Sequence, residues 1–256
     1  MGRRVARLTL DQLAELPGCC AACVFWELPA VQRAKVRGHE CEEKAAWLSE
    51  VLRDWGSCGR VVYVDDVLVG HAIYAPAIYF PGAHGFATAP VSNDAVLLST
   101  LHVAEEFRGQ GLGRVLVQAM AKDLLQRDVR AVEAFGDTRG QPGPLSDHLT
   151  GHRCVVPADF LLAVGFRTQR AHATYPRMRM DLRTTLTWRE EFEIALDRLL
   201  SGIWGRQPRP VHDGGAPRAD RPATTGVGQA MKSDSSRSSA ALGRAPTICL
   251  TTSPSL

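Results

Sequence analysis

The sequence predicts an α/β domain in which helices flank a central mixed, mostly antiparallel sheet. Helix-like and strand-like segments alternate up to about residue 182, and a glycine-rich turn joins one strand to the most regular amphipathic helix. After Trp204 the chain contains no Phe, Trp or Tyr, and Pro, Gly, Ser, Thr, Ala and Arg dominate. Such a composition buries too little apolar surface to offset the entropy cost of folding. Residues 205–256 are therefore expected to form a disordered basic tail.

The composition excludes several other classes of protein. The chain has 256 residues, of which 45% are hydrophobic and 22% are charged, and this is too apolar for a wholly disordered protein. The longest stretch without Asp, Glu, Lys or Arg is interrupted by Pro76, Pro81 and Pro90, so no membrane-spanning helix is expected. Charged residues follow Met1 where a secretory signal would have an apolar run, and the number of cysteines is odd. We therefore expect a cytoplasmic protein with reduced thiols.

The net charge of +3 is unevenly distributed along the chain. Residues 205–256 contain seven Lys or Arg and three Asp, whereas residues 1–204 contain 23 basic and 24 acidic side chains. The globular part is close to neutral, so its charge does not predict a nucleic-acid partner. The tail could contact anionic partners, but a solvated tail is the simpler interpretation.

Local signals define the elements before the glycine-rich turn. Thr9 and Gln12 form a capping-box pattern that opens a short helix, and Asp65-Asp66 between two β-rich runs predicts a hairpin. In chain order, the expected elements are a helix ending at Leu16, a helix over 40–55, strands over 60–64 and 67–75, and a strand over 95–103.

The most regular helix of the sequence follows the turn. Its apolar residues recur at the i, i+3, i+4, i+7 and i+8 positions of one helix face, namely Leu112, Val115, Leu116, Ala119 and Met120. The elements expected after it are a strand over 131–136, a long loop over 137–153, a helix over 158–164 that ends at Gly165, and a strand over 178–182. This completes a domain over residues 1–183.

A further amphipathic helix is expected over residues 184–204. Thr187 and Glu190 have the spacing of a capping box, and an apolar stripe extends from Trp188 to Ile203. The stripe could dock onto the domain, or it could form a contact between two copies in a homodimer. Docking onto the domain is the simpler interpretation.

The glycine-rich turn is the most informative segment of the sequence. It reads Arg108-Gly109-Gln110-Gly111-Leu112-Gly113-Arg114 and leads directly into the amphipathic helix. Such a turn points several backbone N–H groups in one direction at the positive end of the helix dipole, which suits a phosphate or pyrophosphate. The turn lacks the lysine and spacing of a Walker motif, and it lacks the last glycine of the G-x-G-x-x-G dinucleotide fingerprint.

A third phosphate-binding pattern fits the residues. The segment from Leu101 to Gly113 resembles the acetyl-CoA-binding motif of the GNAT (Gcn5-related) N-acetyltransferase family, R/Q-x-x-G-x-G/A, with Arg108, Gly111 and Gly113 at the defining positions. The order of strand, loop, helix, strand and a helix ending in Gly165-Phe166 also resembles this family. The resemblance covers roughly residues 4–183 and implies the GNAT-like acyl-CoA N-acyltransferase fold, with a splayed pair of strands near 95–103 and 131–136. A plain structural turn is the alternative.

The resemblance implies a role for each part of the segment. Backbone amides from Gly109 to Arg114 would bind the pyrophosphate of acetyl-CoA, and main-chain groups of the preceding strand would pair with the pantetheine arm as an added strand. The amide of Val103 would polarise the thioester carbonyl. The implied cofactor-binding residues are Leu101, His102, Val103, Arg108, Gly109, Gln110, Gly111, Leu112, Gly113 and Arg114.

The sequence departs from the family at the expected general acid. Many members have a Tyr four residues before the Gly-Phe pair and an Asn upstream, and these positions are Leu161 and Cys154 here. Two residues are candidates for the catalytic acid–base role. Glu133 lies within an apolar strand and would act as a base if burial raised its pKa, and Cys154 could donate a proton or be acylated. An ordinary salt-bridged glutamate and a buried thiol are the simpler interpretations.

The N-terminal cysteines contain part of a zinc-binding pattern. Cys20 and Cys23 form half of a C-x-x-C zinc site, with Cys19, His39 and Cys41 nearby in the sequence. The second half is not paired at a comparable spacing, so packed thiols are expected and no metal is predicted.

Together these observations predict an N-acetyltransferase that moves an acetyl group from acetyl-CoA, its co-substrate, to a primary amine. The acceptor, which could be a small molecule or a protein, is not encoded in a pattern that we can interpret. The main alternative is a catalytically degenerate sensor or interaction module that binds acyl-CoA, which is suggested by Leu161. A metal- or redox-responsive regulator that uses the N-terminal cysteines is a third possibility.

Overall fold

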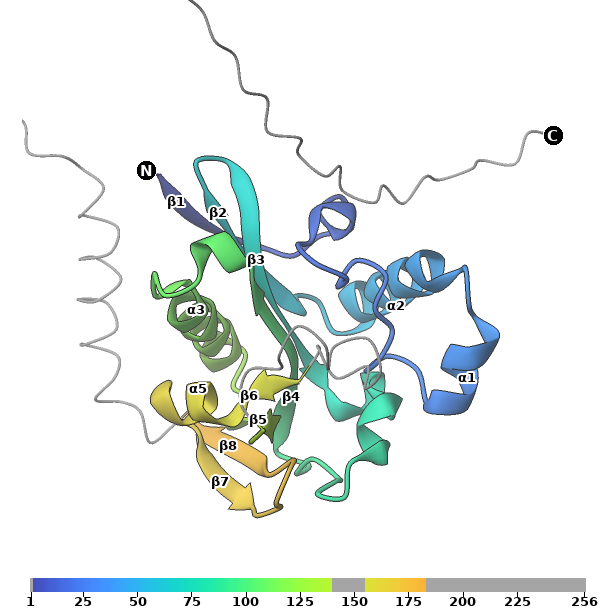
Figure 1. Cartoon of the computed structure of the whole chain (residues 1–256), viewed down its shortest axis with the longest axis vertical. Helices are drawn as coiled ribbons and strands as arrows, with labels where there is room; N and C mark the ends of the chain where they lie inside the picture. Colours follow the sequence, from blue (N-terminus) through green and yellow to red (C-terminus); the bar gives the residue numbers. More distant parts are fainter. Residues whose placement is uncertain (1, 140–154, 183–256) are drawn as a thin grey trace, which may run out of the picture. The chain divides into compact units, whose positions relative to one another are not determined.

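The computed structural model of the chain describes residues 2–139 and 155–182 (Figure 1). Its strands form one sheet with the order β1-β2-β3-β4-β5-β8-β7, and β6 pairs with the end of β5. The strands are β1 (Arg3–Arg7), β2 (Gly59–Val64), β3 (Val67–Pro76), β4 (Ala95–Val103), β5 (Ala131–Asp137), β6 (Val156–Pro157), β7 (Arg167–Arg170) and β8 (Arg177–Asp181). Neighbours along the main path are antiparallel except for β4 and β5, which are parallel. The predicted mixed, mostly antiparallel sheet is confirmed.

The helices cover both faces of this sheet (Figure 1). The described α-helices are α1 (Ala30–Lys35), α2 (Glu40–Asp54), α3 (Leu112–Gln126) and α5 (Ala158–Ala163), with 3-10 turns at Leu13–Glu15, Ala77–Tyr79, Pro81–Gly85 and Glu105–Phe107. The predicted helix ending at Leu16 is wrong. Only the Gln12 half of its capping box forms, with Oε1 accepting the Thr9 N–H at 2.9 Å, and the segment makes a single 3-10 turn.

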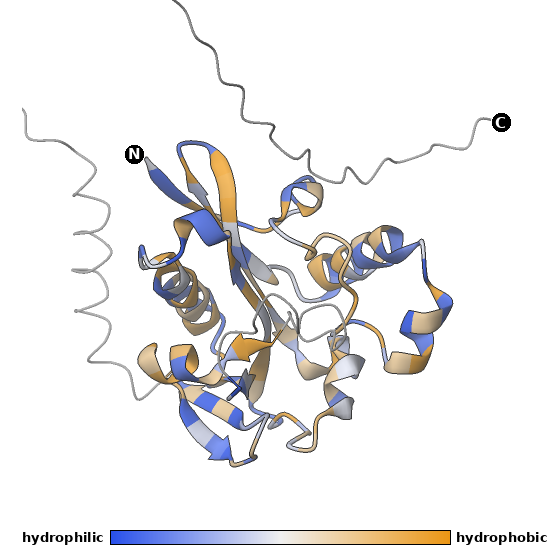
Figure 2. Cartoon of the chain, in the orientation of Figure 1, coloured by the Kyte–Doolittle hydropathy of each residue, from blue (hydrophilic) through white to orange (hydrophobic). Residues whose placement is uncertain are grey.

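Two apolar cores lie on opposite faces of the sheet. On one face, Leu112, Leu116 and Met120 of α3 pack against Val62 and Val132 of the strands. On the other face, α2 and the segment before α1 pack against a second set of strand residues, including Ile73 and Leu97. Figure 2 shows the hydrophobic residues concentrated in the central strands, whereas hydrophilic residues appear on the outer sides of the helices. Alternate residues of each central strand therefore contact different helices.

The parallel pair β4–β5 separates soon after it begins. Only Ala95, Val96 and Leu97 pair, with Ala131, Val132 and Glu133 respectively, although β4 continues to Val103 and β5 to Asp137. The described sheet is thus split along its middle, and the predicted splayed pair is present. The unpaired edge of β4 faces the gap between the two strands.

One extra residue interrupts the pairing of β4 with β3. Ile73 pairs with Thr100 and Tyr74 pairs with Leu98, so Ser99 has no partner across the ladder. The hydroxyl of Ser99 donates to the carbonyl oxygen of Ile73 at 3.1 Å. This bulge lies where β4 leaves β5.

Some sequence predictions lie outside the described residues. They are the 184–204 helix, the 205–256 tail and most of the 137–153 loop with Cys154. Within residues 2–139 and 155–182, no helix combines the length and the apolar character needed to cross a bilayer.

Candidate functional site

The glycine-rich turn has the backbone conformation that only glycine adopts readily. Gly109 has a φ of +76° and Gly111 has a φ of +79°, both in the left-handed region. Gly111 is the N-cap residue of α3, and no side chain caps this end of the helix. A Cβ atom at either glycine would meet nothing within 4 Å, so the turn faces open space.

The first turn of α3 presents its backbone donors at this opening. The N–H groups of Leu112, Gly113 and Arg114 precede the first intrahelical hydrogen bond, which Val115 donates to the carbonyl of Gly111 at 3.1 Å. Because the helix dipole adds partial positive charge there, the turn is suited to an anion such as a pyrophosphate. The residues predicted to bind phosphate are therefore brought together in one turn.

Side-chain hydrogen bonds connect the turn to three neighbouring elements. Arg108 Nε donates to the carbonyl of Val103 in β4 at 3.1 Å, and Arg114 Nη2 donates to the carbonyl of Ala163 in α5 at 2.9 Å. Arg3 of β1 donates to the carbonyl and the side chain of Gln110, both at 3.3 Å. A turn held in this way needs little reorganisation to bind a ligand.

The main chain of β4 leads from the gap to this turn. Ala104 N–H donates to the carbonyl of Val69 in β3 at 2.7 Å. In an antiparallel ladder every second residue bonds to the same neighbouring strand, so the main-chain N–H and C=O of His102 also point toward β3. The main-chain groups of Leu101 and Val103 point the other way, into the gap. They can pair with an extended ligand, whereas the predicted main-chain contact of His102 does not fit this register.

The side chain of His102 belongs to the opposite face from its neighbours. Leu101 and Val103 pack against the core under α3, so His102 faces the side of the segment before α1. Its ring stacks on that of His71 with 5.7 Å between centroids. Partial burial and the positive charge of Arg108 lower the pKa of His102 below its usual value.

Glu133 lies at the base of the gap, at the last paired position of β5. The carboxylate is fully buried and forms ion pairs with Arg177 at 3.2 Å and Arg179 at 3.3 Å, both from β8. It also accepts the backbone N–H of Ser92 at 3.1 Å. These contacts connect β5 to β8 and to the segment before β4. Each oxygen of the Glu133 carboxylate therefore has at least one partner.

The position expected for the general acid is apolar and closed to solvent. Leu161 of α5 is fully buried in the core shared with α3. The preceding residue, Phe160, packs against α3, where a Cβ on Gly113 would lie 3.0 Å from its ring. Cys154, the other candidate, lies outside the described residues, so the described part of the chain has no proton donor at this position.

The cysteines near the N-terminus differ in burial, since Cys20 is buried, Cys23 is half-buried and Cys19 is exposed. Cys19, Cys20, Cys23 and Cys58 are in the thiol form. The hydrogen bond with Cys19 and burial raise the pKa of Cys20, and burial raises the pKa of Cys58 to about 12. No group of three or more His, Cys, Asp or Glu side chains in the described ranges could hold a metal ion.

One cysteine differs from the expectation of reduced thiols. Cys41, at the start of α2, is disulfide-bonded, so that expectation is wrong for this residue. The sequence could not indicate this, because an odd cysteine count leaves the pairing open.

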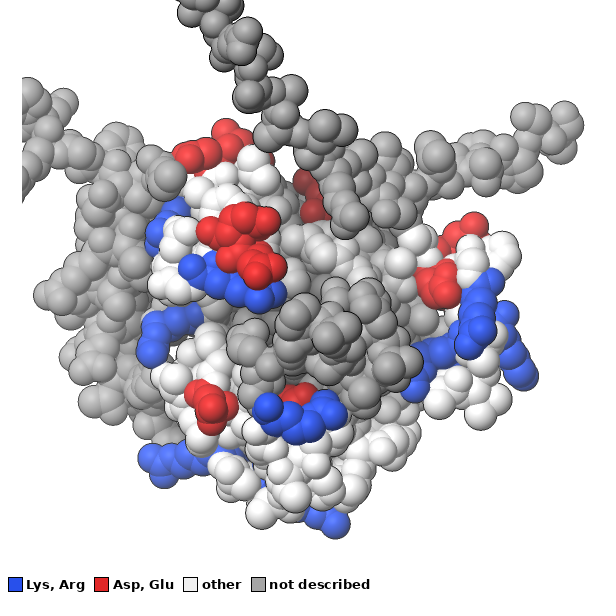
Figure 3. All heavy atoms as spheres, viewed as in Figure 1, with Lys and Arg blue, Asp and Glu red and all other residues white. Residues whose placement is uncertain are grey.

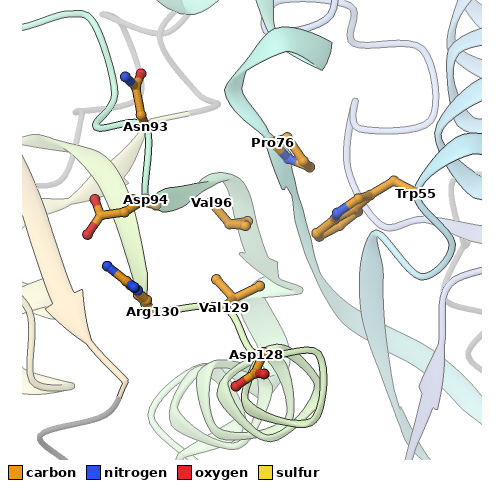
Figure 4. A pocket seen from close by; sticks show the side chains of 9 residues that line it. Trp55, Pro76, Asn93, Asp94, Val96, Asp128, Val129 and Arg130 are labelled. Carbon is orange, nitrogen blue, oxygen red and sulfur yellow. The ribbon is translucent and has the colours of Figure 1, made fainter.

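A separate cavity of about 350 Å³ lies at the other end of the parallel pair (Figure 4). Trp55, Pro76, Val96 and Val129 supply its apolar lining, and Asp94 and Arg130 lie at its polar side. It opens where β4 and β5 begin, whereas the glycine-rich turn follows the end of β4. This cavity is therefore not the predicted cofactor site.

Charged side chains of both signs lie beside one another on the face drawn in Figure 3. Lys and Arg form small groups next to Asp and Glu over the described part of this face. Neither sign dominates there.

The acetyltransferase (GNAT) family model matches residues 11–141, a little over half of the chain. The match includes the glycine-rich turn, α3 and β5. No curated protein matches the sequence.

Several solved structures resemble this chain at low identity. The PaiA N-acetyltransferase from Thermoplasma acidophilum in complex with coenzyme A is 11% identical, with a TM-score of 0.47 over 71% of this chain and 99% of that chain. An N-acetyltransferase from Staphylococcus aureus Mu50 is 15% identical, with a TM-score of 0.46 over 71% of this chain and 99% of that one. The loading GNATL domain of CurA from Lyngbya majuscula is 15% identical, with a TM-score of 0.46 over 72% and 100% of the two chains.

Proposed function

The chain belongs to the GNAT acetyltransferase family, and on this premise we propose that it transfers an acetyl group from acetyl-CoA to a primary amine. The observation that carries the proposal is the glycine-rich turn, which opens α3 beside the gap between β4 and β5. The turn would bind the pyrophosphate through the N–H groups of residues 109–114. The gap would hold the pantetheine arm against the edge of β4, with Leu101 and Val103 as its main-chain partners.

The proposed reaction forms one bond and breaks another. The nitrogen of a neutral amine attacks the thioester carbonyl, and a main-chain amide of β4, for which we propose Val103, stabilises the developing oxyanion. The C–S bond breaks and coenzyme A leaves as a thiol. An ammonium acceptor must lose two protons overall, one to the sulfur and one to solvent, so a base is needed.

A second candidate function follows from Leu161. Its burial leaves the usual proton-donor position apolar. An acyl-CoA-binding sensor or interaction module would retain the turn and the gap but would not catalyse turnover. Binding and turnover must therefore be measured separately.

Calorimetric titration of the full chain with acetyl-CoA tests the proposed cofactor, with NAD and ATP as controls. We expect saturable one-site binding of acetyl-CoA and no binding of the two nucleotides. Release of coenzyme A thiol is then followed with spermidine, kanamycin, a peptide with a free N-terminus and a lysine peptide with a blocked N-terminus. Binding without turnover of any of these amines would favour the sensor.

The variant Gly111→Trp tests the position of the cofactor. The indole would fill the space that the turn leaves open, so we expect acetyl-CoA binding to be lost. Gly38→Trp is a matched control, because Gly38 also has a positive φ, of +89°, and a Cβ there also meets nothing within 4 Å. Both variants should have similar thermal stability. Normal acetyl-CoA binding by Gly111→Trp would contradict the assignment of the turn.

A further inference from the structure

The acceptor amine would approach the gap from the face opposite α3. α3 and α5 pack over one face of the strands around the gap, and Leu101 and Val103 of β4 contribute to that core. The intervening side chain, His102, therefore faces the other side, and it is half-buried rather than enclosed. A half-buried imidazole ring thus lies on the face of β4 opposite α3, in the segment that borders the gap.

Neighbouring residues hold this ring in a defined orientation. His71 pairs with His102 across the β3–β4 ladder, and the two rings stack at an interplanar angle of 27°. His71 is fully buried behind it, and neither of its ring nitrogens has a hydrogen-bond partner. On the other side, a Cβ on Gly18 would lie 3.3 Å from Cε1 and Nε2 of His102, so glycine there lets the main chain approach the ring edge.

The surrounding charges favour the neutral form of His102. Partial burial and Arg108, from the glycine-rich turn, lower its pKa, and the neighbouring Cys19 opposes this with a smaller effect. His71 is neutral at physiological pH because burial, His102 and Lys44 lower its pKa to about 3. A neutral imidazole can accept a proton, whereas the carboxylate of Glu133 is engaged by two arginines.

We propose that His102 is the general base that removes a proton from the acceptor ammonium at this site. The inference rests on the proposed acetyl transfer. Its imidazole takes one proton, and the neutral amine then forms the C–N bond as the C–S bond breaks. The amine nitrogen loses its second proton as the C–N bond forms. Of the two protons that the ammonium loses, one ends on the coenzyme A sulfur and the other in solvent. His102 thereby supplies a base in a site whose usual acid position, Leu161, is apolar.

The test compares His102→Gln with the matched control His39→Gln in the full chain. His39 is an exposed histidine at the start of α2 that pairs with Glu42, away from the glycine-rich turn. Thermal unfolding and calorimetry with acetyl-CoA establish that each variant folds and binds. With the fastest amine among the four probes, we expect His102→Gln to lower kcat/KM by about 10²- to 10⁴-fold. Acetyl-CoA affinity should change less than twofold, and His39→Gln should behave as the wild type.

The pH profile separates a base from a structural residue. The wild type should lose kcat/KM as the pH falls through a value below about 6.5, because protonated His102 cannot accept a proton. This acid limb should disappear in His102→Gln. The inference is overturned if His102→Gln keeps kcat/KM within threefold of the wild type, or if its acid limb is unchanged.

A second measurement decides the case in which the wild type binds acetyl-CoA but acetylates none of the probes. The Cε1–H resonance of His102, assigned as the signal absent from His102→Gln, should shift when acetyl-CoA is added. A resonance that does not move would place the ring away from the cofactor. This result would overturn the inference about His102 and leave the proposed function standing. Failure of the wild type to bind acetyl-CoA would instead overturn the proposed function, and this inference with it.

Discussion

His71 is a buried side chain whose polar atoms are not satisfied by the described residues. Its ring is fully buried, and neither of its nitrogens has a hydrogen-bond partner among the described residues. Burial is the main reason that its pKa falls to about 3, and the neighbouring His102 and Lys44 act in the same direction. An unsatisfied buried donor or acceptor costs about 1–3 kcal/mol. We therefore expect His71 to lower the stability of the domain.

The pH dependence of this cost gives a testable prediction. In the unfolded chain the pKa of a histidine is about 6.5, so between pH 6.5 and 3 the unfolded state binds a proton that the folded state does not. Stability is therefore lost as the pH falls through this window, by about 1.4 kcal/mol per pH unit at most. His71→Leu should be more stable than the wild type at pH 7, and the difference should grow by about 2 kcal/mol at pH 5.

Urea unfolding at the two pH values measures both quantities. His102 is present in both proteins, so the comparison isolates the change at residue 71 together with its coupling to His102. An equal loss of stability in the two proteins between pH 7 and pH 5 would show that His71 is not the group responsible.

At the scale of elements, Asp123 connects α3 to the sheet through a buried polar network. Its carboxylate pairs with Arg60 of β2 at 2.6 Å and accepts the hydroxyl of Tyr74 from β3 at 2.8 Å. Arg127, the C-cap residue of α3, lies 3.6 Å away. Removing one partner of a buried ion pair leaves an uncompensated charge. The network should therefore determine how firmly α3, which bears the glycine-rich turn, is attached to the strands.

Two variants measure this attachment. We expect Asp123→Ala to lower the free energy of unfolding by about 3–5 kcal/mol, because Arg60 stays buried without its partner. Tyr74→Phe removes only one hydrogen bond and should cost about 1 kcal/mol. Chemical denaturation of the two variants provides the comparison. Equal losses would mean that the Arg60–Asp123 pair is not the principal interaction of the network.

The elements also show what the sequence could and could not predict. α2, α3 and the strands β2 to β5 were predictable because each has an apolar face of sufficient length. β1 and β7 were missed because they are short edge strands with mostly exposed side chains, held by main-chain pairing that leaves no periodic signal. The short α1 was also missed, since it has no buried residue.

The candidate site also has parts that the sequence could predict and parts that it could not. The glycine-rich turn was predictable because a local conformation requires its residue types. The partners of Glu133 were not, since Arg177 and Arg179 reach it only through the antiparallel pairing of β8 with β5. The stacking of His71 on His102 depends likewise on the β3–β4 register.

At the scale of the whole domain, β4 has an edge that is not paired with β5 beyond Leu97. The main-chain groups of Leu101 and Val103 face the gap, whereas those of His102 face β3. If the pantetheine arm pairs with β4, acetyl-CoA at one hundred times its Kd should stabilise the fold by about 2.7 kcal/mol. The midpoint of thermal unfolding should rise accordingly.

Amide hydrogen exchange locates this stabilisation. The amides of Leu101 and Val103 should exchange more slowly when acetyl-CoA is added. The His102 amide serves as an internal control, because it is bonded to β3 with or without the ligand and should respond only to the global gain in stability. Protection of all three amides to the same degree would argue against pairing along this edge.

The extra residue in β4 changes which of the two cores each later side chain of the strand faces. Before Ser99, Leu97 points to the core under α2 and Leu98 to the core under α3. After it, Leu101 and Val103 point to α3, and His102 points away. With strict alternation, Leu101 would face away from α3 and His102 would be driven into the apolar core under α3. A single serine without a ladder partner therefore decides whether an imidazole or a leucine lies on the face of β4 opposite α3.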